Sequence, residues 1–198
     1  MTETELMQSI KTNYGAAITA ACQSSAVPPA FVAALIAGES GGNPDAKRFE
    51  SGVLHALWEV LLGRKTAYGS ISRSDLVAYV TRISSAPRVS PDTLPADAFQ
   101  RVDGLATSWG LTQIMGYHIL EKAVGHAADV SILKDTNTHL AMATGMVEGF
   151  AKEFHIDERI QFEKLFRCWN TGRPDGKTFD PMYVNNGMLR ISIWVTQP

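Results

Sequence analysis

The sequence predicts a mainly α, bundle-like domain with one small β element. Apolar residues recur every three or four positions over most of the 198 residues, which is the period of an amphipathic helix. Only Ala46–Glu50 alternates in the manner of a short strand. A hydrophobic content of 45% and a charged content of 19% are ordinary for a globular protein. The length suits a single domain over residues 1–198, with an inserted helical and loop segment at about 51–101.

The expected elements follow the apolar stripes and their stop signals. Helices are predicted at 2–22, 28–38, 53–63, 72–84, 135–154, 162–169 and 181–194. Ala46–Glu50 is the expected strand, and the prolines of Ala86–Ala96 predict a loop. From Thr107 onward we expect helices again, so that Ser108–Gly116 would place small and polar residues within an apolar helical run.

Charge and composition argue against several classes of function. With 18 basic and 20 acidic residues the net charge is −2, so no general attraction to nucleic acid is encoded. No run reaches the ~18 apolar residues that would insert into a membrane. Met1–Leu6 lacks the basic start of a secretory signal, so we expect a protein that is cytoplasmic as made. Cys22 and Cys168 are too few for a disulfide framework, and the five histidines lie singly, so we expect reduced thiols, no metal and no cofactor.

The predicted helix at 28–38 is apolar around most of its circumference and is followed at once by Glu39. Gly41-Gly42 and Asn43-Pro44 then stop the helix and begin a tight turn. The negative end of the helix and the apolar neighbours both favour the protonated form of this carboxyl. A carboxylic acid that keeps its proton near neutral pH can donate it to a leaving oxygen, as glycosidases require. The alternative is a solvated glutamate at a helix end.

Two motifs, one at Glu39 and one at Ser108, resemble the lysozyme-like superfamily, close to goose-type lysozymes, soluble lytic transglycosylases and phage-type N-acetylmuramidases. In those families a helix ends in a catalytic Glu followed by Ser and Gly, as Glu39–Gly41 does here, with Asn-Pro soon after, as at Asn43-Pro44. Their second motif is Ser-x-Gly-x-x-Gln-x-Met. It is matched here by Ser108, Gly110, Gln113 and Met115.

A third motif and a late tyrosine extend the resemblance. The families' aromatic residue followed by Asn-Ala-Gly is similar to Trp169–Gly172, in which Thr171 replaces the alanine. Their tyrosine on a late helix is similar to Tyr183. The resemblance covers roughly residues 27–43 and 107–184, and the order of the motifs agrees throughout.

The resemblance implies a lysozyme-like fold and a glycosidase that cleaves the β-1,4 bond between N-acetylmuramic acid and N-acetylglucosamine, with Glu39 as general acid. Arg48-Phe49-Glu50 is similar to a stretch of phage-type muramidases, so Glu50 is the candidate second catalytic carboxylate. The alternative for Glu50 is a carboxylate that pairs with Arg48 or faces solvent. The implied substrate-binding residues are Ser108, Gln113, Met115, Asn170 and Tyr183. Ser108 could instead bond Glu39 or cap its helix, and Tyr183 could orient Glu39.

Three hypotheses for function stay open at this point. The first is hydrolysis by a muramidase, the second is lytic transglycosylation with 1,6-anhydro products, and the third is a non-catalytic glycan-binding or structural module. The gap between Glu39 and Ser108 is longer than in the transglycosylases, and it holds Glu50. The expected partners are peptidoglycan glycan strands, and we expect a monomer. A phage or prophage endolysin would reach the wall by holin-type release, in a phage particle or by another secretion route.

Overall fold

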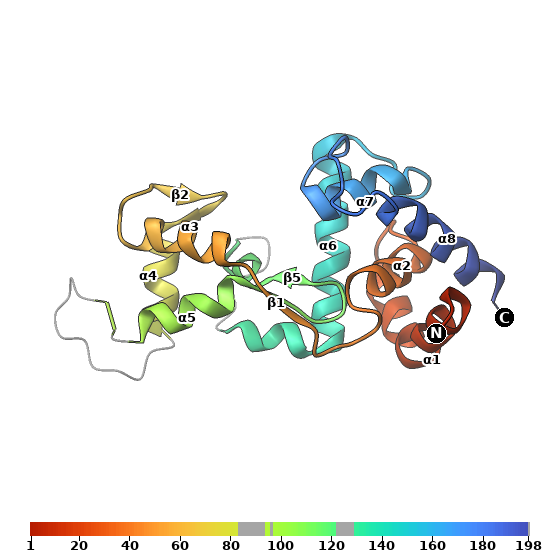
Figure 1. Ribbon diagram of the computed structural model, residues 1–198, viewed down its shortest axis with the longest axis horizontal. Coiled ribbons are helices and arrows are strands. Elements are labelled where there is room, and N and C mark those ends of the chain that lie inside the picture. Colours follow the sequence, from red (N-terminus) through yellow and green to blue (C-terminus); the bar gives the residue numbers. More distant parts are fainter. Residues whose placement is uncertain (83–93, 96, 122–128, 198) are drawn as a thin grey trace. The chain divides into compact units, whose positions relative to one another are not determined.

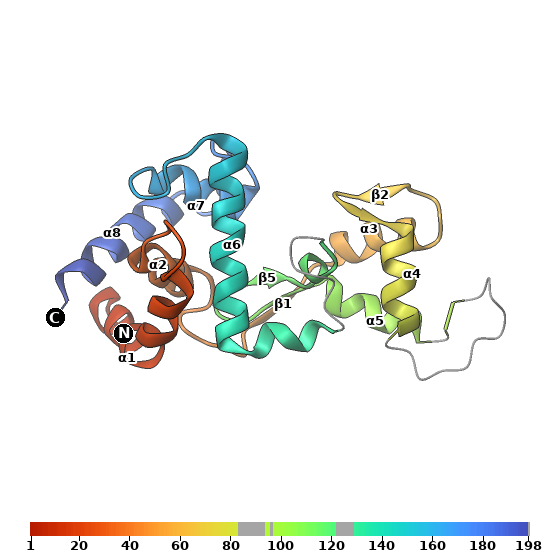
Figure 2. The same ribbon diagram turned by 180° about the vertical axis from the view of Figure 1, so that it is seen from behind.

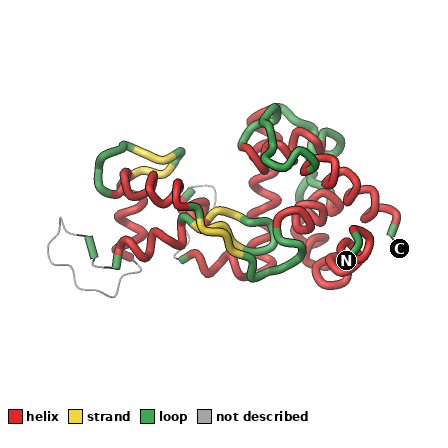
Figure 3. Tube along the Cα trace, viewed as in Figure 1, coloured by secondary structure: helices red, strands yellow, loops and turns green. Residues whose placement is uncertain are grey.

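A computed structural model describes residues 1–82, 94–95, 97–121 and 129–197, which fall into two compact units. The first unit comprises Met1–Pro44 and Asp135–Pro198, and the second comprises Asp45–Lys134. The described residues form eight α-helices and two small antiparallel sheets (Figure 1, Figure 3). The predicted mainly α class with a small β part is therefore confirmed. The single domain with an insertion at about 51–101 stays a prediction.

The first unit is a bundle of five helices arranged around α2. Its helices are α1 (Glu3–Cys22), α2 (Pro29–Glu39), α6 (Thr136–Phe154), α7 (Phe162–Thr171) and α8 (Tyr183–Thr196). Helix α2 packs against α8, α1 and α6 (Figure 2). Eight of its eleven residues are buried, because the helix is apolar around most of its circumference. The expected core helix is confirmed.

The ends of these helices follow local capping signals. Thr2 and Glu5 form a reciprocal capping box at the start of α1. The Asp135 carboxylate accepts the Thr138 amide at 2.9 Å and begins α6. Gly172, with a φ of 76°, ends α7. Because such signals are local, the predicted helix limits agree with the structure within two residues wherever the ends are described.

The second unit combines three helices with two sheets. Its helices are α3 (Ser51–Leu61), α4 (Arg73–Arg82) and α5 (Ala98–Leu105), and the 3-10 turns are η1 (Gly116–Leu120) and η3 (Val130–Lys134). Strands β2 (Ala67–Tyr68) and β3 (Ile71–Ser72) form a hairpin before α4. The other sheet has the antiparallel order β1 (Lys47–Phe49), β4 (Thr107–Trp109), β5 (Ile114–Met115). Strand β1 confirms the expected strand.

The predicted helical state of Ser108–Gly116 is wrong, because this stretch forms β4, a tight turn and β5. Gly110 and Gln113 have φ values of 69° and 56°, which lie outside the helical region. The Gly110 amide donates to the Ala46 carbonyl at 2.8 Å, so the turn also bonds to the segment before β1. Pairing with β1 therefore outweighs the weak helical period of these residues.

The loop predicted for Ala86–Ala96 lies outside the described residues, apart from Leu94 and Pro95, and helix α5 was not predicted. Within the described parts of the chain, no helix combines the length and the apolar character needed to cross a membrane.

Candidate active site

Glu39 is the last residue of α2, and it is hydrogen-bonded to the first residue of α8. The Tyr183 hydroxyl donates to Glu39 Oε1, although the two residues lie 144 positions apart. They meet because α2 and α8 pack side by side in the first unit. Burial, the charge of Glu39 and this hydrogen bond together raise the pKa of Tyr183 far above its usual range. The phenol therefore stays protonated and keeps its role as donor to Glu39.

An aromatic stack fixes the start of α8. The Phe166 ring lies 4.6 Å from the Phe31 ring of α2 and meets the Tyr183 ring edge-on at 6.0 Å, measured between centroids. One turn further along α8, a Cβ placed on Gly187 would come within 2.5 Å of Phe166 Cζ. The glycine thus allows α8 to approach the ring closely. This packing holds Tyr183 next to Glu39 at the end of α2.

The turn after Glu39 is held by bonds to its own backbone and to α1. Gly41 and Gly42 have φ values of 61° and 82°, which non-glycine residues rarely adopt. Ser40 Oγ accepts the Gly42 amide at 3.2 Å, and the Tyr14 hydroxyl donates to the Gly42 carbonyl at 3.0 Å. The Gly-Gly signal in the sequence therefore marks a real structural requirement at this point.

Asn170 lies in the last turn of α7 in the same unit, with an exposed side chain. Within the described parts of the chain its side chain makes no hydrogen bond. Its neighbour Thr171 donates from Oγ1 to the Arg167 carbonyl at 2.8 Å, and Gly172 closes the helix. The structure thus gives this motif a clear role as a helix end, while sugar binding by Asn170 stays a prediction.

The predicted binding residues Ser108, Gln113 and Met115 all lie in the second unit, where Met115 pairs with Ser108 across the β4–β5 hairpin. Gln113 Oε1 accepts the Ser108 hydroxyl at 2.8 Å. Gln113 Nε2 donates to the Ala46 carbonyl at 3.1 Å and to the Gly110 carbonyl at 2.9 Å. Both donors of this amide are therefore occupied by protein carbonyls, and its visible role is to tie the hairpin to the segment before β1. Because Ser108 lies in a strand, the suggestion that it caps a helix is wrong.

Glu50 also lies in the second unit, at the residue before α3. Its carboxylate accepts a hydrogen bond from Arg48 Nε at 2.6 Å. The pair is largely open to solvent, since 73% of the Arg48 side chain and 35% of the Glu50 side chain are exposed. The pairing with Arg48, which was the alternative drawn from the sequence, is therefore observed, and a catalytic role for Glu50 stays a prediction.

The seven predicted site residues thus divide between the two units. In the first unit Glu39 and Tyr183 are in contact, and in the second Ser108 and Gln113 are in contact. Sequence reasoning missed an ion pair between Glu3 and Arg190, which no local pattern marks, because 187 positions separate them. The described His, Cys, Asp and Glu residues include no group of three that could hold a metal ion.

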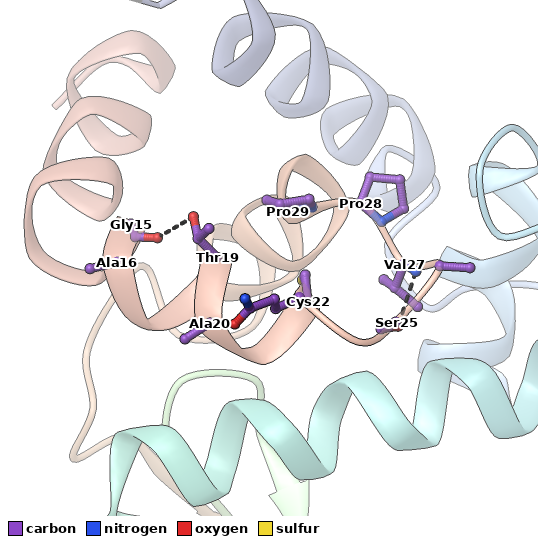
Figure 4. A pocket seen from close by; sticks show the side chains of 11 residues that line it. Gly15, Ala16, Thr19, Ala20, Cys22, Ser25, Val27, Pro28 and Pro29 are labelled. Carbon is purple, nitrogen blue, oxygen red and sulfur yellow. Dashed lines mark hydrogen bonds between the residues drawn. The ribbon is translucent and has the colours of Figure 1, made fainter.

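An open hollow of about 750 Å³ lies at the turn between α1 and α2 (Figure 4). It is lined mainly by small and apolar residues around Cys22, Pro28 and Pro29. Burial raises the pKa of Cys22 to about 11, so this thiol is protonated and weakly nucleophilic near neutral pH. The hollow lies at the N-terminal end of α2, whereas Glu39 ends the same helix. Because its thiol is protonated and weakly nucleophilic, the hollow is a weaker candidate for a catalytic site than the Glu39–Tyr183 pair.

Comparison with models of protein families, with curated proteins and with solved structures finds no significant match for this chain. The inference of function therefore depends on the motifs of the sequence and on the contacts described above.

Proposed function

We propose that this protein is a lysozyme-like glycosidase that cleaves the β-1,4 bond between N-acetylmuramic acid and N-acetylglucosamine in peptidoglycan. The observation that carries the proposal is the hydrogen bond from Tyr183 to Glu39 at the end of a buried helix. Glu39 is the residue that the motifs mark as the acid, and a second marked residue, Tyr183, contacts it. The sequence motifs and the hydrogen bond thus support the same two residues, and both residues lie in the first unit.

In this mechanism Glu39 is the general acid. The Tyr183 hydroxyl holds Oε1, so that Oε2 carries the proton that passes to the leaving O4 of N-acetylglucosamine as the C1–O4 bond breaks. Hydrolysis then requires a water to attack C1 and to give up its proton to a carboxylate. Proton transfer of this kind contributes ~10²–10⁴-fold to the rate, and electrostatic stabilisation of the oxocarbenium ion must supply much of the rest.

The ion pair of Glu50 favours a second candidate, lytic transglycosylation. The Arg48 guanidinium already binds Glu50 Oε1 at 2.6 Å, so this carboxylate is engaged and is less available to orient an attacking water. A transglycosylase needs no such base, because the 6-hydroxyl of the muramoyl residue attacks C1 and returns its proton to Glu39. The product then carries a 1,6-anhydro end and is lighter by one water than the product of hydrolysis.

The decisive experiment compares the clearing of purified peptidoglycan by wild type, Glu39→Gln and Glu153→Gln. Glu153 is an exposed glutamate on α6 and serves as the matched control. We expect Glu39→Gln to lose about 100-fold or more of the clearing rate, and Glu153→Gln to keep it. Clearing by Glu39→Gln at the wild-type rate would refute Glu39 as the acid.

The products of wild type then separate the two reactions. If mass spectrometry of the products finds reducing ends and no 1,6-anhydro ends, the reaction is that of a muramidase. If it finds a 1,6-anhydro end on every fragment, the reaction is that of a transglycosylase. If wild type binds peptidoglycan without cleaving it, both enzymatic proposals are refuted and the protein is a non-catalytic glycan-binding module. An endolysin that acts on the wall after release from the cell is the biological role we propose for the cleaving enzyme.

A further inference from the structure

An ion pair of the first unit lies next to the hydrogen-bonded Glu39–Tyr183 pair. Arg190 of α8 donates from Nε to Glu3 Oε2 at 2.7 Å and from Nη2 to Glu3 Oε1 at 2.9 Å. Two parallel bonds of this kind hold the plane of a guanidinium in one orientation. Only 13% of the Arg190 side chain is exposed, against 37% for Glu3. The positive charge is therefore held in a defined place.

The remaining guanidinium nitrogen, Nη1, lies against the last turn of α2. A Cβ placed on Gly38 would come within 3.3 Å of Arg190 Nη1 and 3.7 Å of Tyr183 Cε2. Gly38 directly precedes Glu39, and it has no side chain to keep the guanidinium and the phenol ring away. The side chains of Arg190 and Tyr183 therefore both lie against Gly38, next to the end of α2.

The positive charge of Arg190 acts electrostatically on the Glu39–Tyr183 pair. It lowers the pKa of Tyr183, in opposition to burial and to the charge of Glu39, which raise it. Among the described neighbours within the first unit, Glu3 of α1 is bonded to Arg190, the uncharged ring of Phe166 on α7 packs against Tyr183, and the negative end of α2 lies at Glu39. Arg190 is thus a positive charge held beside the acid pair.

We propose that Arg190 is a positioning residue that sets how readily Glu39 holds its proton, and that Glu3 adjusts this effect by neutralising the guanidinium. This inference rests on the proposed function of Glu39 as an acid. A lone cation beside a carboxyl favours the ionised form, which cannot protonate a leaving group. A cation whose charge is largely cancelled by Glu3 keeps the packing at Gly38 with a much smaller effect of this kind.

The proposal predicts opposite effects for the two halves of one ion pair. In the full chain labelled with [13C]glutamate, the Glu39 carboxyl signal is assigned by its loss in Glu39→Gln and is then titrated. We expect Arg190→Gln to move the Glu39 titration midpoint to higher pH, and Glu3→Gln to move it to lower pH, each by about half a pH unit or more. If the Glu3–Arg190 ion pair had only a structural role, its loss would shift the Glu39 titration midpoint in the same direction in both variants.

Arg190→Lys keeps the charge but loses the paired hydrogen bonds to Glu3, so its Glu39 midpoint should stay at or below that of wild type and should not rise towards that of Arg190→Gln. Arg173→Gln and Asp175→Asn are the matched controls. This ion pair of the same unit is 72% and 74% exposed, and its variants change the net charge equally. We expect neither control to move the midpoint.

The outcomes separate this inference from the proposed function. If wild type clears peptidoglycan, the alkaline limb of its pH–rate profile should move with the Glu39 midpoint in both variants. Opposite shifts in a protein that does not cleave peptidoglycan would refute the proposed function and retain the control of Glu39 by Arg190. Shifts in one direction, or no shift in either variant, would overturn the inference even if the enzyme is active.

Discussion

Replacing Gly187 by alanine should measurably destabilise the first unit. The added Cβ would lie 2.5 Å from Cζ and 2.7 Å from Cε2 of Phe166, closer than carbon atoms approach in folded proteins. The ring is rigid and only 1% exposed, and it also packs against Phe31, so it cannot move away without repacking. Overpacking of this kind costs about 1–3 kcal/mol.

Gly145→Ala is the matched control for helix propensity. Gly145 lies within α6, and a Cβ at that position has open space around it. Both substitutions gain the same helix propensity of about 1 kcal/mol, so their difference isolates the steric cost. We therefore expect Gly187→Ala to be less stable than Gly145→Ala by about 1–3 kcal/mol in urea denaturation followed by fluorescence and circular dichroism.

The same variant probes the site, because Phe166 packs against Tyr183. A displaced ring should shift the Tyr183 hydroxyl and reduce the rate of peptidoglycan clearing at temperatures where the protein is still folded. Equal or higher stability of Gly187→Ala relative to Gly145→Ala would refute the close packing of α8 on Phe166.

Three further substitutions test the site and its support. Tyr183→Phe removes the hydrogen bond that holds Oε1 of the protonated Glu39, worth about 0.5–1.5 kcal/mol between neutral groups, so clearing should slow by roughly 2–10-fold with the fold retained; an unchanged rate would contradict the role of Tyr183 in holding Glu39. Gln113→Ala leaves the carbonyls that its amide serves without that donor, and thermal denaturation should show a loss of about 1–3 kcal/mol; an unaltered melting temperature would refute this. Burial raises the pKa of Glu121, but the hydrogen bond and charge of His118 outweigh it, so the net pKa lies below the ordinary 4.5. The stability that ionised Glu121 contributes is present above its unfolded pKa and is lost as pH falls through the lower folded value. Glu121→Gln should therefore lose less stability than wild type on acidification below about pH 4.5, and parallel pH curves would disprove this.

All described α-helices except α5 could be predicted from the sequence because their signals are local. The stripe of α6 begins directly after Asp135, and the capping box of α1 begins at Thr2, so both boundaries are marked by neighbouring residues. Strands β4 and β5 could not be predicted in this way, since two or three residues are too few to show a period of two. The positive φ of Gln113 gives no signal in the sequence either.

The candidate site was predictable only in part, for a related reason. The turn residues after Glu39 place its carboxyl at the end of a buried helix, and the structure agrees. The contact with Tyr183 entered only as one of two roles suggested by a family resemblance, because it depends on the packing of α8 against α2. The Glu3–Arg190 pair was missed, since single charges far apart in a chain give no indication that they meet.

The order of the elements along the chain has a consequence for synthesis. Helix α2 is made early, but α6 and α8, which cover it, follow only after the whole second unit. At ~5–20 residues per second, α2 waits roughly 7–30 s on the ribosome for α8. During this time its apolar surface is open to chaperones and to other nascent chains, whereas the second unit, a continuous segment, can fold first. We therefore expect the yield of folded protein to depend on elongation rate and chaperone supply, and the early release of truncated chains to favour aggregation.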